Sequence, residues 1–267
     1  MNEAKTDISE PQVLQTSQDG ITHLTLNRPE RRNSLSLAML ESLSGMLARV
    51  AKDPDTRVVV LAAKGKVFCA GHDLREIQGE LDQKAALQEL FTLCSRVMQQ
   101  IVDLPQPVIA RAAGVATAAG CQLIASCDLA VASESARFAT PGVNIGLFCS
   151  TPMVALSRNV SRKHAMEMLL TGEMISADRA ERIGLVNRVV AEDDLDRSIH
   201  ELASTIAAKS SHTLKIGKQA FYRQLEMGLA EAYEYTSEVM VTNLGAQDAE
   251  EGICAFLDKR SPQWRDR

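Results

Sequence analysis

The chain has 267 residues, of which 45% are hydrophobic and 24% charged, and its formal net charge is -5. This length is enough to bury a full core, so we expect one large domain or one domain with a small appendage. The acidic balance argues against a general nucleic-acid-binding protein, which usually presents a basic face. It leaves room for a small anionic ligand, because local basic side chains also occur in acidic proteins.

Residues 1–19 are polar and mixed in charge. We predict a frayed or disordered lead-in there rather than a signal peptide. No apolar run approaches the roughly 20 residues of a membrane span, so no membrane helix is predicted. The six cysteines form no CxxC pair and mostly lie in apolar segments, which favours reduced, buried thiols. We therefore predict a cytoplasmic protein, or one of the mitochondrial matrix if a transit peptide has been removed.

Up to about residue 150, segments with strand patterns alternate with segments with helix patterns. Strands are predicted at 21–26, 58–63, 107–112 and 129–133. Helices are predicted at 37–51, after FCAGHDL with an apolar face from Leu87 to Ile101, and at 117–127. The run VVVLAA at 58–63 is continuously apolar, as expected of a strand that is buried on both faces. This alternation predicts an α/β fold with much parallel sheet.

Beyond residue 150 the pattern becomes nearly all helical. Ser176 has the position of a helix N-cap, and Gly184 that of the residue that ends the same helix. A further helical stripe runs from Leu195 to Ile206. The helices predicted from 211 onward carry more apolar side chains than a solvated tail needs, which indicates docking against the body or another subunit.

Several common motifs are absent from the sequence. It contains no GxG, no GxxxxGK[ST], no HExxH and no GxSxG. The five histidines are too scattered to indicate a metal site. Dinucleotide, phosphate-loop, zinc and serine-hydrolase functions are therefore disfavoured, and we predict neither a metal nor a cofactor.

Two small-residue loops remain as candidates for chemistry. CAGHD at 69–73 follows one predicted strand, and GVATAAGCQ at 114–122 follows another and opens a helix. Small residues let a ligand approach the backbone N–H groups, and a helix N-terminus adds partial positive charge. Two such donors aimed at one point would stabilise an enolate or a tetrahedral oxyanion. Close packing of helix on sheet also selects alanine and glycine, so composition alone leaves both interpretations open.

Six ordered segments carry a resemblance: LNRPERRNSLS, KVFCAGHDL, GVATAAGCQLIASCDLAVAS, FATPGVNIGLF, LLTGEMISADRAERIGLVNRVV and EEGICAFLDKRSPQW. Together they resemble the enoyl-CoA hydratase/isomerase (crotonase) superfamily from about residue 20 to the C-terminus. The resemblance implies a crotonase-like spiral of ββα units over 20–205 and a helical trimerisation module over 206–267. It further implies a coenzyme A thioester as substrate, no other cofactor, and a homotrimer or a dimer of trimers.

The resemblance also implies site residues. The backbone N–H groups of His72 and Ala119 would form the oxyanion hole for the thioester carbonyl. The adenine and pantetheine groove would be lined by Ala70, Gly71, His72, Asp73 and Leu74. Arg28 would meet the CoA phosphates, and Lys259 would reach the ligand of a neighbouring subunit.

The sequence departs from the family's pattern at both catalytic positions. Hydratases of the family use two glutamates, and here Gln122 and Gly142 stand in their places. Hydration needs a base for water and an acid for the α-carbon, and neither residue supplies one. Enoyl-CoA hydration in fatty-acid metabolism is therefore only the nominal reaction, and a double-bond isomerase is no better supported. If only the carboxylates are missing, glutamate at both positions should restore hydration.

His72 leaves two alternatives open. A histidine at this loop also occurs in methylmalonyl-CoA decarboxylase-like members of the superfamily, and decarboxylation needs mainly enolate stabilisation and a proton donor. Otherwise only the His72 backbone acts, and the protein is an acyl-CoA enzyme of another kind or a non-catalytic acyl-CoA binder. Asp73 is expected to fix the turn or cap the next helix. Cys149 and Ser150 would lie along the acyl chain, but they lack an identifiable base.

Overall fold

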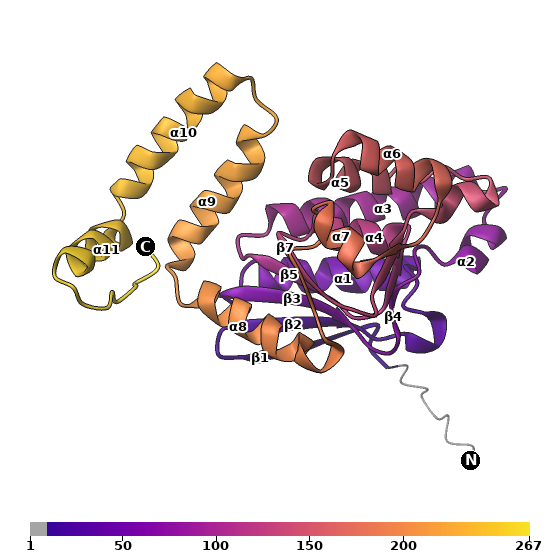
Figure 1. Ribbon diagram of the computed structural model, residues 1–267, viewed down its shortest axis with the longest axis horizontal. Helices are drawn as coiled ribbons and strands as arrows, with labels where there is room; N and C mark the ends of the chain where they lie inside the picture. The colour runs from indigo at the N-terminus through magenta and orange to yellow at the C-terminus, as the bar shows by residue number, and fades with distance from the viewer. Residues whose placement is uncertain (1–9) are drawn as a thin grey trace, which may run out of the picture.

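The computed structural model describes residues 10–267 and has an α/β body from which a helical arm projects (Figure 1). The body contains two sheets. The larger sheet has the order β1-β2-β3-β5-β7-β10, with β1 Val13–Gln18, β2 Ile21–Leu26, β3 Val58–Ala63, β5 Val108–Ala112, β7 Leu129–Ser133 and β10 Arg188–Val190. The smaller sheet has the order β4-β6-β8-β9, with β4 Val67–Cys69, β6 Val115–Thr117, β8 Arg137–Ala139 and β9 Ile175–Ser176.

The helices follow the strands along the chain. They are α1 Leu37–Val50, α2 Leu74–Gly79, α3 Lys84–Asp103, α4 Ala119–Ser126, α5 Pro152–Asn159, α6 Arg162–Thr171, α7 Ala177–Arg182, α8 Leu195–Ala207, α9 Ser211–Gln224, α10 Leu229–Leu244 and α11 Gln247–Leu257. Short 3-10 turns are η1 Pro29–Arg31, η2 Pro141–Ile145 and η3 Glu192–Asp194. The α/β class, the four predicted strands and the helical second half are confirmed.

Strand β3 explains how the body is layered. It pairs in parallel with β2 on one side and β5 on the other. Its alternate side chains enter two different cores: Val59 and Leu61 pack into the large core that includes α1 and α3, whereas Val58 and Val60 pack with α8. The run VVVLAA is therefore buried on both faces, as predicted.

The N-terminal prediction is wrong for part of its range. Val13–Gln18 is an ordered edge strand that pairs antiparallel with β2, and Val13 is fully buried. The sequence VLQTSQ has no clear strand pattern, because most side chains of this strand face solvent and are polar. Residues 1–9 of the predicted frayed segment lie outside the described residues.

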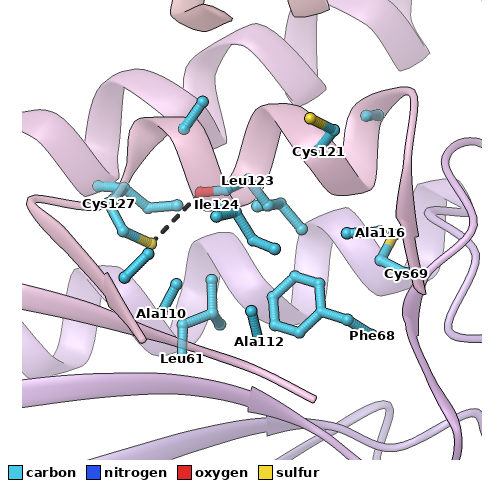
Figure 2. Close-up of a cluster of buried hydrophobic side chains, with 14 of the residues drawn as sticks. Leu61, Phe68, Cys69, Ala110, Ala112, Ala116, Cys121, Leu123, Ile124 and Cys127 are labelled. Carbon is cyan, nitrogen blue, oxygen red and sulfur yellow. Dashed lines mark hydrogen bonds between the residues drawn. The ribbon is translucent and has the colours of Figure 1, made fainter. Parts of the chain in front are cut away.

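Glycines allow the helix α4 and the small sheet to approach closely. In the core, Leu123 and Ile124 of α4 face Phe68 and Leu61 (Figure 2). A Cβ built on Gly120 would lie only 2.1 Å from the Cys69 carbonyl oxygen, so no side chain fits there. The α4 N-terminus is thereby held against the end of β4.

Helices α9, α10 and α11 form the arm, which extends away from the sheets (Figure 1). A buried ion pair fixes α9 to the body: Lys218 Nζ lies 2.7 Å from Asp128 Oδ2 and donates to the carbonyls of Ile101 and Gln106, each at 3.0 Å. The Tyr222 hydroxyl donates to the other oxygen of Asp128 at 2.9 Å. The division of the chain at 205 and 206 stays a prediction, although α8 ends close by at Ala207.

Details of the helical half match the sequence. The Ser176 side chain accepts from the Arg179 N–H and caps α7, and Gly184 follows that helix with φ of 85°. All six cysteines are free and five are buried, but Cys254 is exposed, contrary to the prediction of buried thiols. Within 10–267 no helix is long and apolar enough to cross a membrane.

Candidate functional site

The fold brings the two small-residue loops together. The first loop begins at the last residue of β4, and the second contains β6 and opens α4. Because β4 and β6 pair in parallel, the segments that follow them leave the small sheet at the same end. Across the gap, the Thr117 hydroxyl donates to the Ala70 carbonyl at 3.0 Å. A Cβ built on Gly71 would lie 2.9 Å from the Ala118 Cβ and 3.5 Å from the Ala119 nitrogen. Gly71, which has φ of 93°, is therefore the residue that allows the loops to touch.

The N–H groups of His72 and Ala119 have no protein acceptor among residues 10–267, and neither do those of Gly120 and Cys121 in the first turn of α4. The residues beside the first two are engaged on one side: the Asp73 N–H donates to the Leu35 carbonyl at 3.3 Å, and the Ala118 N–H to the Ala139 carbonyl at 2.9 Å. Ala119 is the first residue of α4, so its N–H has no intrahelical acceptor and lies at the positive end of the helix. These are the two N–H groups that the resemblance implies as oxyanion donors, and their action on a ligand stays a prediction.

Ala118 holds the turn in an unusual conformation. Its φ of 51° and ψ of -118° lie in a region that residues with a side chain rarely adopt. Such a conformation costs about 1–3 kcal/mol and persists only where the surroundings enforce it, as they often do at functional sites. Here the β6–β8 ladder and the contact with Gly71 enforce it.

Gln122 lies on the same face of α4 as Ala119, three residues further along. Its side chain is 4% exposed, and its Oε1 finds no protein donor within the described residues. Helix side chains lean toward the helix N-terminus, so the Gln122 side chain covers the turn that contains Ala119. Gln122 can therefore orient a ligand oxygen, but it cannot take up a proton.

Gly142 lies in η2, and no side chain can be placed there without a shift of its surroundings. A Cβ on it would lie 2.6 Å from the Leu147 carbonyl oxygen and 2.9 Å from Cys149 Sγ. Burial raises the pKa of the Cys149 thiol, although a backbone hydrogen bond from Gly142 opposes this, so the group stays protonated and is a poor base. At the second glutamate position the carboxylate is therefore missing, and the surrounding atoms leave no room for a side chain that could carry one.

The His72 ring packs into the body. Its Nδ1 lies 3.3 Å from the Leu35 carbonyl oxygen, and the ring meets Phe91 edge-on with centroids 4.9 Å apart. Its Nε2 is buried without a protein partner in 10–267. Burial lowers the pKa of His72, and the bond to Leu35 opposes this only in part, so the ring is neutral near pH 7. This packing favours a role for the backbone over one for the ring.

The remaining predicted residues are less closely grouped. The Asp73 carboxylate accepts from the Arg75 N–H at 3.1 Å and caps α2, as expected. Leu74 is 54% exposed beside it. Arg28 donates to the Ser36 hydroxyl at 3.1 Å, so its guanidinium is partly engaged. Lys259 follows α11 on the arm, and Figure 1 shows α11 far from α2 and α4 within this chain.

Sequence reasoning missed Thr140. This residue directly follows β8 and is 0% exposed, yet its hydroxyl has no protein partner within 10–267. The segment FATPG gave only a weak signal, a polar residue between a strand and a proline. In the described part of the chain, no three His, Cys, Asp or Glu side chains are grouped as a metal ion would require.

A family model described as enoyl-CoA hydratase/isomerase matches residues 16–267. The chain belongs to the enoyl-CoA hydratase/isomerase family. It is 50% identical over 257 residues to the enoyl-CoA hydratase domain-containing protein 3, mitochondrial, of Rattus norvegicus, which covers 96% of this chain and 85% of that protein.

Solved structures of the enoyl-CoA hydratase/isomerase family agree with the fold. The crystal structure of an enoyl-CoA hydratase of Mycobacterium smegmatis has a TM-score of 0.93 and 53% identity, covering 96% of this chain and 99% of that one. The crystal structure of the human enoyl-CoA hydratase domain-containing protein 3 has a TM-score of 0.92 and 49% sequence identity. It covers 95% of this chain and 100% of that one. The predicted crotonase-like fold is confirmed.

The atoms around Gly142 argue against the expectation that glutamates at positions 122 and 142 restore hydration. We expect the double variant Gln122→Glu, Gly142→Glu to show no gain in crotonyl-CoA hydration, because the new side chain collides with Leu147 O. The collision should lower the free energy of unfolding by about 1–3 kcal/mol, as overpacking usually does. Gly45→Glu is the matched control, since a Cβ on Gly45 meets nothing within 4 Å.

Thermal unfolding and the hydration rate should be measured for both variants. A well-folded double variant that hydrates crotonyl-CoA at least 10-fold faster than the wild type would show that the space at residue 142 opens readily. The idea that Leu147 and Cys149 block it would then be wrong.

Proposed function

We propose that this protein binds acyl-CoA thioesters and polarises the thioester carbonyl between the N–H groups of His72 and Ala119. The observation that carries this proposal is the pair of N–H groups on two touching loops, neither of which has a protein acceptor within 10–267. Two donors aimed at a developing oxyanion lower the barrier to enolate formation, each by about 2.7–4 kcal/mol. The segment from Ala70 to Leu74 would line the groove for the adenine and the pantetheine arm beside them.

For the reaction, enoyl-CoA hydration remains the nominal assignment, as a lyase or isomerase of fatty-acid metabolism. Gln122 offers no base and Gly142 no side chain, so hydration through the family's two glutamates is not available to this chain. We infer that enolate stabilisation without strong acid–base help is what the site supplies. Its function is then a slow reaction at the acyl chain, or acyl-CoA binding alone.

Decarboxylation is the second candidate. A carboxylate on the acyl chain would meet no negative charge at positions 122 and 142, which favours a malonyl-type thioester. Loss of CO2 leaves the electron pair of the broken C–C bond on the enolate, which the two N–H groups stabilise, and water then supplies the proton. The buried, neutral His72 ring is not needed as the proton donor.

The apolar side chains of the arm support assembly into a homotrimer or a dimer of trimers. Leu229, Val241, Phe256 and Leu257 are each more than 70% exposed in the single chain, which is unusual unless a partner covers them. Such an assembly would bring Lys259 to a neighbour's ligand. The protein would act in the cytoplasm or in mitochondria, the compartment that is part of the names of its rat and human relatives.

The test combines turnover and binding on one sample. Crotonyl-CoA and longer trans-2-enoyl-CoAs are followed by loss of the enone absorbance, malonyl-CoA by release of CO2, and butyryl-CoA binding by calorimetry. We expect binding of butyryl-CoA together with hydration far below that of a two-glutamate hydratase. Lack of binding by every CoA ester would contradict the proposed function.

A further inference from the structure

Residues 264–267, which we call the strap, return from α11 to the root of the arm at residues 208–210, between α8 and α9 (Figure 1). Trp264 Nε1 donates to the Ala208 carbonyl at 2.9 Å. The Asp266 carboxylate accepts from the N–H of Ser211, the first residue of α9, at 2.8 Å. The strap therefore joins the last helix of the arm to the beginning of its first helix.

A residue of the body, Arg57, binds the strap and the root of the arm together. It precedes β3, and its side chain is 24% exposed. The guanidinium donates to the carbonyls of Ala207 and Lys209 at 2.7 and 2.6 Å. It also donates to both carboxylate oxygens of Asp266, at 2.7 and 3.2 Å. Carbonyls at the end of a helix lack an intrahelical donor, and a guanidinium has enough donors to serve them and a carboxylate at once.

A buried carboxylate of α11 holds the strap from the other side. Asp248 is 2% exposed, and its two oxygens accept from the N–H groups of Arg265 and Asp266 at 2.7 and 2.9 Å. Its own N–H donates to the Arg267 carbonyl at 3.1 Å. Hydrogen bonds to an ionised carboxylate are stronger than those between neutral groups. The first turn of α11 is therefore fastened to the strap.

Packing inside the arm contributes little to the position of α11. Within this chain only Asp248 and Ala255 of α11 are buried, and none of the described residues of α10 is. A groove of about 560 Å³ lies between α9, α10 and α11, and its lining is mostly apolar, with Leu214, Leu244 and Ile253 among the side chains. Buried apolar area is what usually holds one helix on another, so the hydrogen bonds of the strap must supply most of the attachment of α11.

Helix α9 is attached to the body independently of the strap, because its Lys218 and Tyr222 side chains bind Asp128. We propose that the strap locks α11 against the root of the arm. Its release then lets α11 move away from α9 and open the groove, while α9 stays on the body. The lock is independent of the proposed function, because the strap lies far from α2 and α4 within this chain (Figure 1).

Hydrogen exchange followed by mass spectrometry tests the lock on the wild type, on a variant that ends at Gln263, and on Asp266→Asn. In the shortened variant the amides of α11 should exchange at least about 10-fold faster, whereas those of residues 215–224 in α9 should stay within about 2-fold of the wild type. Asp266→Asn should act in the same direction but less strongly, because it removes the ion pair with Arg57 and keeps an acceptor for the Ser211 N–H. Asp258→Asn is the matched control: this carboxylate beside α11 is 66% exposed and lies outside the strap, so exchange should not change.

The melting temperature shows whether each variant is folded and separates local release from a general loss of stability. A folded shortened variant whose α11 exchanges at the wild-type rate would overturn the lock. Equal acceleration of α9 and α11 would overturn it too, since the strap would then support the whole arm. If the shortened variant does not fold, Asp266→Asn decides: faster exchange in α11 alone supports the lock, and unchanged or uniformly faster exchange refutes it.

Discussion

Ala119→Pro should lower any thioester-dependent turnover by at least about 100-fold, because it removes one oxyanion donor worth about 2.7–4 kcal/mol. Proline has no N–H, and its fixed φ suits the first position of a helix, which Ala119 occupies in α4. Proline also disfavours the φ of 51° and ψ of -118° that Ala118 adopts before it, so some loss of stability is expected beside the loss of the donor. Steady-state kinetics with the best substrate found, compared at equal folded fraction, gives the measurement.

A matched control places proline at the start of another helix. Arg162 is the exposed first residue of α6, and Arg162→Pro should keep full turnover. Circular dichroism and the melting temperature show whether each variant is folded. Turnover within a few-fold of the wild type in folded Ala119→Pro would mean that the Ala119 N–H is not an oxyanion donor.

Lys218→Met should lower the free energy of unfolding by about 3–5 kcal/mol, the usual cost of breaking a buried ion pair from one side. The Lys218 side chain is 6% exposed and satisfies Asp128 and two backbone carbonyls. Methionine fills a similar volume but carries no positive charge. The mostly buried Asp128 carboxylate then keeps only the hydrogen bonds from the Tyr222 hydroxyl and the Val108 N–H. Because the pair fixes α9, the arm should also loosen.

Urea unfolding measures the effect, with Lys215→Met as the control. Lys215 is an exposed lysine one turn earlier on α9, so its substitution should change stability by less than about 0.5 kcal/mol. Size-exclusion chromatography reports any change in assembly. Equal stability of the two variants would show that the ion pair does not fix the arm to the body.

The sequence was informative where local pattern decides structure. The run VVVLAA predicted a doubly buried strand, and the stripes of helices α1, α3 and α8 predicted helices, because burial on a fixed face imposes those periods. The composition of the two loops left both an oxyanion hole and close helix–sheet packing open, and only the resemblance to the family singled out His72 and Ala119 as donors. Strand β1 was missed, since an edge strand with exposed side chains lacks the apolar signal.

What the sequence could not reveal depends on contacts between distant segments. That Gly142 has no room for a side chain follows from the placement of Leu147 O and Cys149 Sγ around it. The direction of the His72 ring depends on Leu35 and Phe91. Thr140 had only a weak signal in the sequence, because the burial of its hydroxyl and the lack of a protein partner within 10–267 follow from the fold.

The most direct test of the oxyanion hole is the infrared difference spectrum of bound butyryl-CoA labelled with carbon-13 at the thioester carbonyl. This ester has no double bond to hydrate, so the spectrum reports binding alone. Hydrogen bonds from His72 and Ala119 should shift the carbonyl band of the bound ester to lower frequency, and the shift should become smaller in Ala119→Pro, which keeps only the His72 donor. A bound ester whose carbonyl band stays at the frequency of the free ester would contradict the oxyanion hole.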